Sequence, residues 1–395
     1  MLKGKNVVLG ITGGIAAYKS CEVVSRLIKL NANVDVIMTD AATRFVTPLT
    51  FETLSLNPVT VGMFEQKKTW EVGHISLAKK ADLLAVVPAT ANIIAKATSG
   101  LADDMLSTTI LATRAPLLFA PAMNTAMLTN PITQQNIALL KQKGARFVES
   151  ATGRLACGDI GEGKLADVDD IMTAIIDRLF PDKRLLGKKI MVTAGATQEA
   201  VDGVRFLTNK SSGAMGFAIA KKAREMGAAV TLISGIHKGE IPFGVENIDV
   251  VTTQQMYEQV LDKCKDFDAV IKAAAPADYR VENYNVKKHK EERLTLTFVK
   301  NPDIAQAVGK IKGGTKLVVF AAETENLIEN AKAKLISKNA DLVVANDVTQ
   351  KGAGFDVSTN IVTLIDKAGN ISSLPKMTKE EVALAILEKL MQIMQ

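Results

Sequence analysis

Two segments of the chain open in the same way: a Gly-Lys pair, a short apolar run, and a glycine turn before a helical pattern. Residues 3–10 read KGKNVVLG, and residues 186–195 read LGKKIMVTAG. This order is typical of the first strand of a doubly wound α/β sheet. Because residues 181–184 have the composition of a linker, we predict two Rossmann-like domains, 1–186 and 187–395.

Short apolar runs then alternate with helical patterns, as expected for parallel sheets with helices on both faces. In the first half we predict strands at 5–10, 34–39, 82–87, 116–120 and 146–148, and helices at 15–30, 91–98, 103–113 and 125–142. In the second half we predict strands at 189–194, 229–234, 247–251, 268–274, 316–321 and 341–345. The lysine-rich stretch 279–297 lacks periodicity and is predicted to form a hairpin or flap.

Composition excludes several classes of protein. No run of 18 apolar residues is free of charge or glycine, so we expect no membrane span and no membrane partner. A glycine turn interrupts the first apolar run, which argues against a signal peptide. Three distant cysteines, Cys21, Cys157 and Cys264, favour a reducing cytoplasm over a disulfide framework. The net charge of +6 suits a nucleic-acid binder, but aromatic content is only 5% and the basic residues are spread along helices, so we expect no nucleic-acid partner.

The first glycine turn is a candidate phosphate site. Gly13 and Gly14 open the first helix, but Tyr18 stands where a P-loop has glycine before Lys19, and no Gly-x-Gly-x-x-Gly is present. Close backbone approach to one phosphate fits a mononucleotide such as FMN better than NAD. A tight turn without a ligand is the alternative.

Polar residues follow other strands of the first half at the same predicted edge. Thr39 ends the second strand, and Thr90 and Asn92 follow the third. The segment LFAPAMNTAM, 118–127, places Asn124 after the fourth. Since ligands bind beyond the carboxyl ends of such strands, an amide there can hold a carboxylate or a flavin edge.

Two further side chains are candidates for proton transfer. His74 begins an amphipathic helix; it is either structural or able to exchange a proton near neutral pH. Cys157 lies in the glycine-rich loop ATGRLACGDIGEG, which suits a proton donor better than a core residue.

Together, His74, the PAMN segment with Asn124, and the glycine-flanked Cys157 resemble the flavin-dependent cysteine decarboxylases. The resemblance implies a flavodoxin-like fold, FMN bound near Gly13, Thr39, Thr90 and Asn92, a catalytic His74, Asn124 on the substrate carboxylate, and Cys157 as proton donor. Leu128 departs from the pattern, which has an aromatic near this position. FMN would oxidise the thiol to create the electron sink that decarboxylation needs.

The second half carries polar residues on a long connection and at strand ends. Val192–Gly216 contains Arg205, Asn209 and a Ser-Ser-Gly helix start, which is a candidate anion site. Lysines on the flap, with Lys334 and Lys338 one helical turn apart, could surround a triphosphate with Mg²⁺; a solvated lysine face is the alternative.

These segments resemble phosphopantothenate–cysteine ligase, which in bacteria is fused behind the decarboxylase in this order. The resemblance implies that CTP, 4′-phosphopantothenate and cysteine are substrates, with Asn209 and Lys288 catalytic and Arg205 and Asn209 on the substrate. The implied CTP contacts are Asp278, Lys288, Asn301, Pro302, Asp303, Ile304, Phe320, Lys334 and Lys338, with Mg²⁺ on the nucleotide and its ligands unassigned. Glu291 replaces a lysine of the flap pattern.

The expected function is therefore a bifunctional enzyme of coenzyme A biosynthesis that ligates cysteine through an acyl-cytidylate and then decarboxylates the product. The resemblance also implies a homo-oligomer, with ligase dimers and decarboxylase trimers or dodecamers. A non-catalytic flavin-fold protein and a two-domain NAD-linked dehydrogenase are the alternatives; CO₂ release and NADH titration distinguish them.

Overall fold

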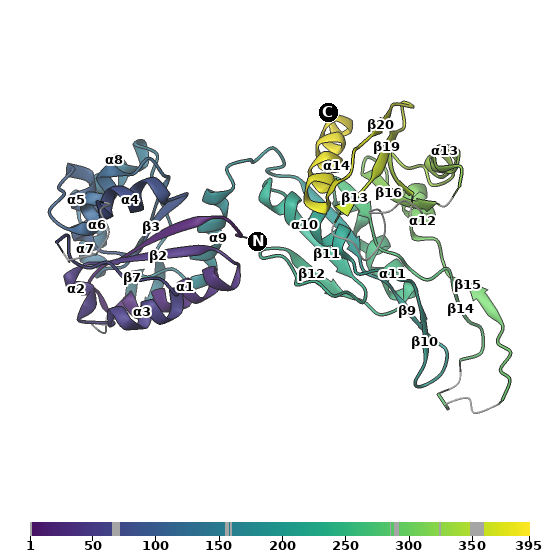
Figure 1. Ribbon diagram of the computed structural model, residues 1–395, viewed down its shortest axis with the longest axis horizontal. Coiled ribbons are helices and arrows are strands. Elements are labelled where there is room, and N and C mark those ends of the chain that lie inside the picture. The colour runs from purple at the N-terminus through teal and green to yellow at the C-terminus, as the bar shows by residue number, and fades with distance from the viewer. Residues whose placement is uncertain are drawn as a thin grey trace. The chain divides into compact units, whose positions relative to one another are not determined.

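The computed structural model describes residues 2–64, 72–154, 158, 160–284, 286–287, 292–323, 325–347 and 359–395. The chain forms two compact units, Met1–Pro181 and Asp182–Gln395, each with its own sheet (Figure 1). The predicted boundary at residue 186 is a few residues late. Leu185 already belongs to the second unit, because its side chain is buried in that core and its N–H donates to the Met226 carbonyl at 2.9 Å.

The first unit is a parallel sheet in the order β2-β1-β3-β4-β5. This is the strand order of flavodoxin-like folds, so the predicted fold class is confirmed. The central strands are buried on both faces, which explains their continuous apolar runs. The strands are β1 (Asn6–Ile11), β2 (Asn33–Met38), β3 (Leu83–Ala89), β4 (Leu117–Pro121) and β5 (Arg146–Phe147).

Helices cover both faces of this sheet (Figure 1). They are η1 (Ile15–Lys19), α1 (Ser20–Lys29), α2 (Asp40–Thr43), α3 (Pro48–Ser55), α4 (Gly73–Lys80), α5 (Ala91–Ser99), α6 (Met105–Ala112), α7 (Thr125–Thr129), α8 (Pro131–Gln142) and α9 (Val168–Leu179). The helix predicted at 125–142 is two helices, because Asn130 caps α8 and Pro131 occupies its first turn. The helix predicted at 15–30 begins with the 3₁₀ turn η1.

An antiparallel hairpin of β6 (Ala151–Arg154) and β7 (Ile160–Lys164) is attached to the loop after β4. The Met123 N–H donates to the Gly163 carbonyl at 2.9 Å, and the Thr125 hydroxyl donates to the Glu162 carbonyl at 2.7 Å. Gly163 has φ +116°, and a Cβ there would lie 2.2 Å from the Met123 carbonyl oxygen. Only glycine therefore allows this close approach of the hairpin to the Asn124 loop.

The second unit is an eight-stranded sheet in the order β12-β11-β8-β13-β16-β17-β19-β20. Its first six strands are parallel and match the six predicted ones. The last two strands in this order, β19 and β20, are antiparallel and were not predicted. The strands are β8 (Lys189–Ala194), β11 (Ala229–Ser234), β12 (Glu246–Asp249), β13 (Ala269–Lys272), β16 (Lys316–Glu323), β17 (Leu342–Asp347), β19 (Val362–Asp366) and β20 (Ile371–Ser373).

Two apolar clusters fill the opposite faces of this sheet. One packs α10 and α14 against it, and the other packs α11, α12 and α13. The helices are α10 (Ala214–Glu225), α11 (Thr253–Lys263), η2 (Cys264–Asp266), α12 (Ile304–Ile311), α13 (Leu327–Ser337) and α14 (Lys379–Met394). A capping box of Thr378 and Glu381 starts α14.

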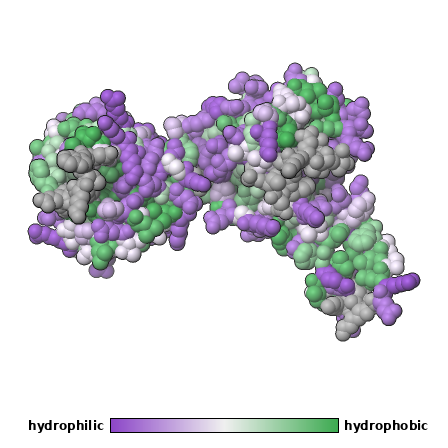
Figure 2. Space-filling view, viewed as in Figure 1, coloured by the Kyte–Doolittle hydropathy of each residue, from purple (hydrophilic) through white to green (hydrophobic). Residues whose placement is uncertain are grey.

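Two antiparallel ribbons project from the second unit: β9 (Gln198–Ala200) with β10 (Phe206–Thr208), and β14 (Tyr279–Val281) with β15 (Phe298–Lys300). The predicted flap thus falls within the β14–β15 connection. Figure 1 shows both ribbons extending away from the sheet, and Figure 2 shows hydrophobic residues gathered in that region. Exposed apolar residues of the two ribbons include Val204, Phe206, Tyr279 and Phe298. The last short pair is β18 (Thr359–Asn360) with β21 (Met377–Thr378).

Candidate functional site

The first candidate site is a cavity of about 520 Å³ at the carboxyl ends of the first unit's strands. It is lined by residues from the glycine turn, the ends of β3 and β4, and the β6–β7 hairpin. Three of the predicted residues meet there: Gly13, Thr90 and Asn124. Met123 and Met127 form part of the wall, whereas Leu128 packs in the core. Leu128, which stands near the position of the family aromatic, is therefore not part of this wall.

Hydrogen bonds fix the edge of the cavity. The Thr12 hydroxyl donates to the Pro88 carbonyl at 2.7 Å and accepts from the Thr90 N–H at 3.2 Å, which ties the ends of β1 and β3 together. The Asn124 Oδ1 accepts from the Ala126 N–H at 2.8 Å and caps α7. This bond orients the carboxamide, whose Nδ2 is the group able to donate to a carboxylate.

The glycine turn is tightly packed on one side. A Cβ on Gly13 would lie 2.4 Å from the Ala41 Cβ, so a side chain there would displace the backbone of the turn. A Cβ on Gly14 would meet only the Thr90 Cγ2, at 4.0 Å. The open side of the turn faces the cavity, which fits close approach of a phosphate to the backbone.

Three predicted residues lie outside this lining. Thr39 caps α2, where its hydroxyl oxygen accepts from the Ala42 N–H at 3.3 Å. Asn92 is exposed in the first turn of α5, and His74 is half-buried in the first turn of α4. Cys157 lies outside the described residues.

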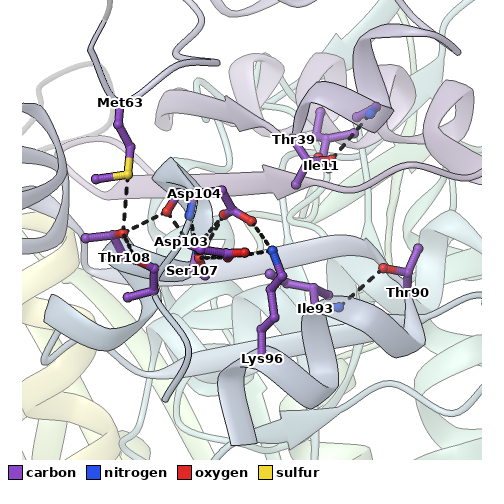
Figure 3. Close-up of polar contacts among 12 residues, drawn as sticks. Ile11, Thr39, Met63, Thr90, Ile93, Lys96, Asp103, Asp104, Ser107 and Thr108 are labelled. Atoms are coloured by element: carbon purple, nitrogen blue, oxygen red, sulfur yellow. Dashed lines mark hydrogen bonds and ion pairs between the residues drawn. The ribbon is translucent and has the colours of Figure 1, made fainter. Parts of the chain in front are cut away.

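The acidic start of α6 has a structural partner (Figure 3). Lys96 contacts Asp103 at 2.6 Å and Asp104 at 2.7 Å, and Asp104 forms a capping box with Ser107. Burial would raise the pKa of Asp104, but Lys96 and the Ser107 donors lower it below its usual range. These carboxylates join α5 to α6 and are not part of the cavity lining.

The second candidate site is a cavity of about 490 Å³ at the carboxyl ends of β8, β13, β16 and β17. Asn209, Phe320 and Lys334 are the predicted residues that line it. The Asn209 Nδ2 donates to the Pro276 carbonyl at 2.9 Å, which holds the amide across the end of β13. Gly213 caps α10 with φ +76°, and the helix start also lines the cavity.

Arg205, which is predicted to contact the substrate, has a carboxylate partner in the structure. Its guanidinium forms an ion pair with Asp202, whose side chain is completely buried, at 2.5 Å. Arg205 is not in the cavity lining. Its positive charge is compensated within the β9–β10 loop.

The charged CTP candidates occur as ion pairs. Lys334 contacts Glu323 at 2.6 Å, and Lys338 contacts Asp303, which also caps α12. Burial would raise the pKa of Asp303, but the Lys338 ammonium and the Gln306 N–H lower it. A nucleotide phosphate would therefore compete with carboxylates for these lysines.

The remaining residues predicted to contact CTP differ in how far their side chains are exposed. Asn301 is buried, with its Nδ2 donating to the Ala277 carbonyl at 2.9 Å, and Ile304 is part of the core. Contacts from these two would have to come from the backbone. Pro302 is half-buried, Asp278 is exposed, and Lys288 lies outside the described residues.

The structure brings two further polar residues into the second cavity. Lys272, the last residue of β13, lines the second cavity, and burial lowers the pKa of its ammonium although Asp303 and Asp278 oppose the shift. Asn346, near the end of β17, also lines it, and its Oδ1 is buried without a hydrogen-bond partner in the described structure. In the sequence, only their positions near the ends of predicted strands indicate that they could belong to the site.

The described residues form no group of three or more His, Cys, Asp and Glu side chains that could hold a metal ion. Among the described helices, none combines the length and apolarity that a membrane crossing requires.

Both halves of the chain match known protein families. Residues 1–180 match the Flavoprotein family, and residues 185–394 match the DNA/pantothenate metabolism flavoprotein C-terminal domain. The Coenzyme A biosynthesis bifunctional protein CoaBC of Bacillus subtilis is 44% identical, with 99% of this chain and 97% of that protein covered. The protein of that name from Escherichia coli is 41% identical, with 98% and 97% covered. A crystal structure of a C-terminal domain of CoaBC is 40% identical, covers 53% of this chain and 97% of that chain, and has a TM-score of 0.47.

The fold and the two cavities thus define a flavoprotein domain followed by a ligase-type α/β domain. The chain belongs to the family of bifunctional coenzyme A biosynthesis proteins CoaBC. The sequence-based resemblance is confirmed for both halves.

Proposed function

We propose that this chain converts 4′-phosphopantothenate, cysteine and CTP into 4′-phosphopantetheine at two separate sites. The second unit ligates cysteine to phosphopantothenate, and the first unit decarboxylates the product. The observation that carries the proposal is that each unit holds its own cavity at the carboxyl edge of its sheet. Asn124 lines the first cavity and Asn209 lines the second.

Ligation requires a carboxylate to become a good acyl donor. The pantothenate carboxylate attacks the α-phosphorus of CTP, the bond to the β-phosphate oxygen breaks, and pyrophosphate leaves. The cysteine amine then attacks the acyl carbon and releases CMP, and the amine loses a proton. Asn209, held by the Pro276 carbonyl, orients the acyl group, and Lys334 with Lys288 offsets the charge that develops on the phosphates.

Mg²⁺ is expected on the nucleotide rather than in a protein cage. Mg²⁺ keeps several waters and binds through one or two carboxylates plus substrate phosphates. Asp303 and Glu323 are the carboxylates close to the lysines of the site.

Decarboxylation requires an electron sink, which FMN supplies by accepting two electrons from the substrate thiol carbon and later returning them. The residues present fit a flavin phosphate, because the Gly13–Gly14 turn leaves its backbone open toward the cavity. The chain's own residues orient the substrate and protonate the product. Asn124 donates to the departing carboxylate, and Cys157 supplies the proton. His74, Thr39 and Asn92 remain proposals from the family resemblance.

The assembly and location follow from the resemblance and composition. We expect ligase dimers, which the exposed apolar side chains of the β9–β10 and β14–β15 ribbons support. Trimers, or dodecamers built from trimers, are expected for the first unit. A cytoplasmic location suits the three dispersed cysteines.

The nucleotide is tested by supplying phosphopantothenate, cysteine and either CTP or ATP, and by following pyrophosphate release with and without Mg²⁺. CTP should support release at least ten times faster than ATP, and removal of Mg²⁺ should stop it. Equal rates with both nucleotides would contradict the assignment of CTP.

Separate sites are tested with Asn209→Asp. The added negative charge beside the Pro276 carbonyl should stop pyrophosphate release while CO₂ release from phosphopantothenoylcysteine persists. Asn326→Asp makes the same atomic change at an exposed loop residue outside the cavity lining and should leave both activities unchanged. Loss of both activities in a folded Asn209→Asp protein would contradict two separable sites.

A further inference from the structure

The cavity beside Asn124 contains two basic residues that the proposed chemistry leaves without a role. Arg154 ends β6 and Lys164 ends β7, and both line the cavity. Both side chains are exposed, and neither has a hydrogen bond or ion pair within the described ranges. Within the described part of the chain, they therefore present two positive charges without a charged partner on a wall that is otherwise rich in glycine, alanine and methionine.

The attachment of the hairpin determines where these charges lie. Gly163, which precedes Lys164, accepts from the Met123 N–H at 2.9 Å, so the base of the hairpin is fixed to the Asn124 loop. The Lys164 side chain then runs toward the opposite strand. A Cβ on Gly153 would lie 3.8 Å from the Lys164 Nζ. The ammonium thus lies next to the residue that precedes Arg154.

Arg154 and Lys164 therefore line the same cavity from the two strands of the hairpin, and the Lys164 ammonium lies alongside β6. Arg154 pairs with Ile160, three residues before Gly163. At about 3.3 Å per residue, Arg154 lies about 10 Å further along the hairpin than the anchor at the Asn124 loop. The pantothenoyl chain, from its cysteine carboxylate to its phosphate, is long enough to span that distance.

The chemistry of the substrate identifies the occupant. A phosphate monoester carries between one and two negative charges at neutral pH and presents three acceptor oxygens. Arginine and lysine are the side chains that bind such a group, arginine through its fork of donors and lysine as a point charge. The flavin phosphate is assigned to the glycine turn on the other wall, where Lys19 is the neighbouring cation.

We propose that Arg154 and Lys164 bind the terminal phosphate of the decarboxylase substrate and select phosphopantothenoylcysteine over its dephosphorylated form. The proposal rests on the proposed function of the first unit. It assigns substrate selection to the hairpin and leaves the carboxylate to Asn124.

The test compares Arg154→Gln and Lys164→Gln with the wild type on both phosphopantothenoylcysteine and pantothenoylcysteine. Each variant should lose roughly 10- to 100-fold in kcat/KM on the phosphorylated substrate, because a hydrogen bond to a charged group is lost. The loss should be mainly in KM. On the dephosphorylated substrate, each variant should match the wild type, and flavin absorbance per chain should be unchanged. Lys29→Gln, an exposed lysine of α1 outside the cavity, is the matched control and should behave as wild type.

Three results would overturn the assignment: equal losses on both substrates, loss of flavin from the variants, or a wild type with no preference for the phosphorylated substrate. Loss of flavin would assign the two residues to the flavin phosphate instead. If the wild type released no CO₂ from either substrate, the proposed function itself would fail. Calorimetric binding of 4′-phosphopantetheine against pantetheine would then still decide whether the hairpin binds phosphate.

Discussion

The close approach of Gly163 to the Asn124 loop predicts a large and specific effect of Gly163→Ala. Alanine at φ +116° adopts a backbone region that L residues avoid, and its Cβ would lie 2.2 Å from the Met123 carbonyl oxygen. The hairpin and the loop must therefore move apart by about an ångström to reach ordinary contact distance. That movement removes the 2.9 Å bond between the Met123 N–H and the Gly163 carbonyl.

The expected loss of folding free energy in Gly163→Ala has two contributions, one from the backbone conformation and one from the lost contact. The left-handed backbone costs roughly 1–2 kcal/mol for alanine. The lost hydrogen bond adds about 1 kcal/mol. Gly144→Ala is the matched control, because Gly144 has φ +91° and a Cβ there would have nothing within 4 Å. The control should show only the backbone part.

The assay follows both stability and chemistry. Urea unfolding of the first unit should show Gly163→Ala about 1 kcal/mol less stable than Gly144→Ala. CO₂ release from phosphopantothenoylcysteine should fall about 100-fold in Gly163→Ala alone, since misplacement of catalytic groups by an ångström has effects of that size. Pyrophosphate release by the second unit should be unchanged in both. If Gly163→Ala kept wild-type decarboxylation, the hairpin attachment would not position the site.

Two further predictions concern the second unit. Lys338→Gln should raise the KM for CTP about tenfold and leave decarboxylation unchanged, as measured by pyrophosphate and CO₂ release; a KM equal to the wild-type value would remove Lys338 from the nucleotide site. Burial would raise the pKa of Asp366, but Lys389 and the Asn370 donors lower it to about 2. A carboxyl group with a lowered native pKa stabilises the fold above its unfolded pKa of about 3.9 and loses that effect as pH falls toward 2. Asp366→Asn should therefore lower the free energy of unfolding by about 2 kcal/mol at pH 7, with the difference shrinking between pH 4 and pH 2 in urea titrations; a difference independent of pH would contradict the assigned pKa.

The central parallel strands of both units were predictable because each is a short apolar run that is largely buried. A short apolar run such as that of β1 or β8 fits either a strand or a buried helix by its pattern alone. The glycine turn that follows each run indicates a strand. The antiparallel strands β19 and β20 were not predicted. β19 is a buried strand between β17 and β20, whereas β20 is the edge strand, held by one partner and exposed along its whole length. The local sequence pattern carries little information about an exposed edge strand of this kind.

Site residues could be predicted from the sequence mainly where they lie near the predicted end of a strand. Asn124 stands out because its amide follows an apolar strand at the ligand edge, and Asn209 because it precedes a Ser-Ser-Gly helix start. Lys272 was missed, since a lysine that ends a strand looks like a solvated residue until the surrounding elements bury it. The role of Arg205 on the substrate stays a prediction; the structure adds its ion pair with the buried Asp202, which residue spacing alone did not indicate.

The stoichiometry of the full reaction tests the central claim of two sequential sites most directly. The wild-type protein is given 4′-phosphopantothenate, cysteine, CTP and Mg²⁺, and pyrophosphate and CO₂ are measured together over time. We predict equal final amounts, with CO₂ lagging behind pyrophosphate, and no CO₂ when CTP is omitted unless phosphopantothenoylcysteine is supplied. Pyrophosphate without CO₂ in a flavin-loaded protein, or CO₂ formed from phosphopantothenate without CTP, would contradict that claim.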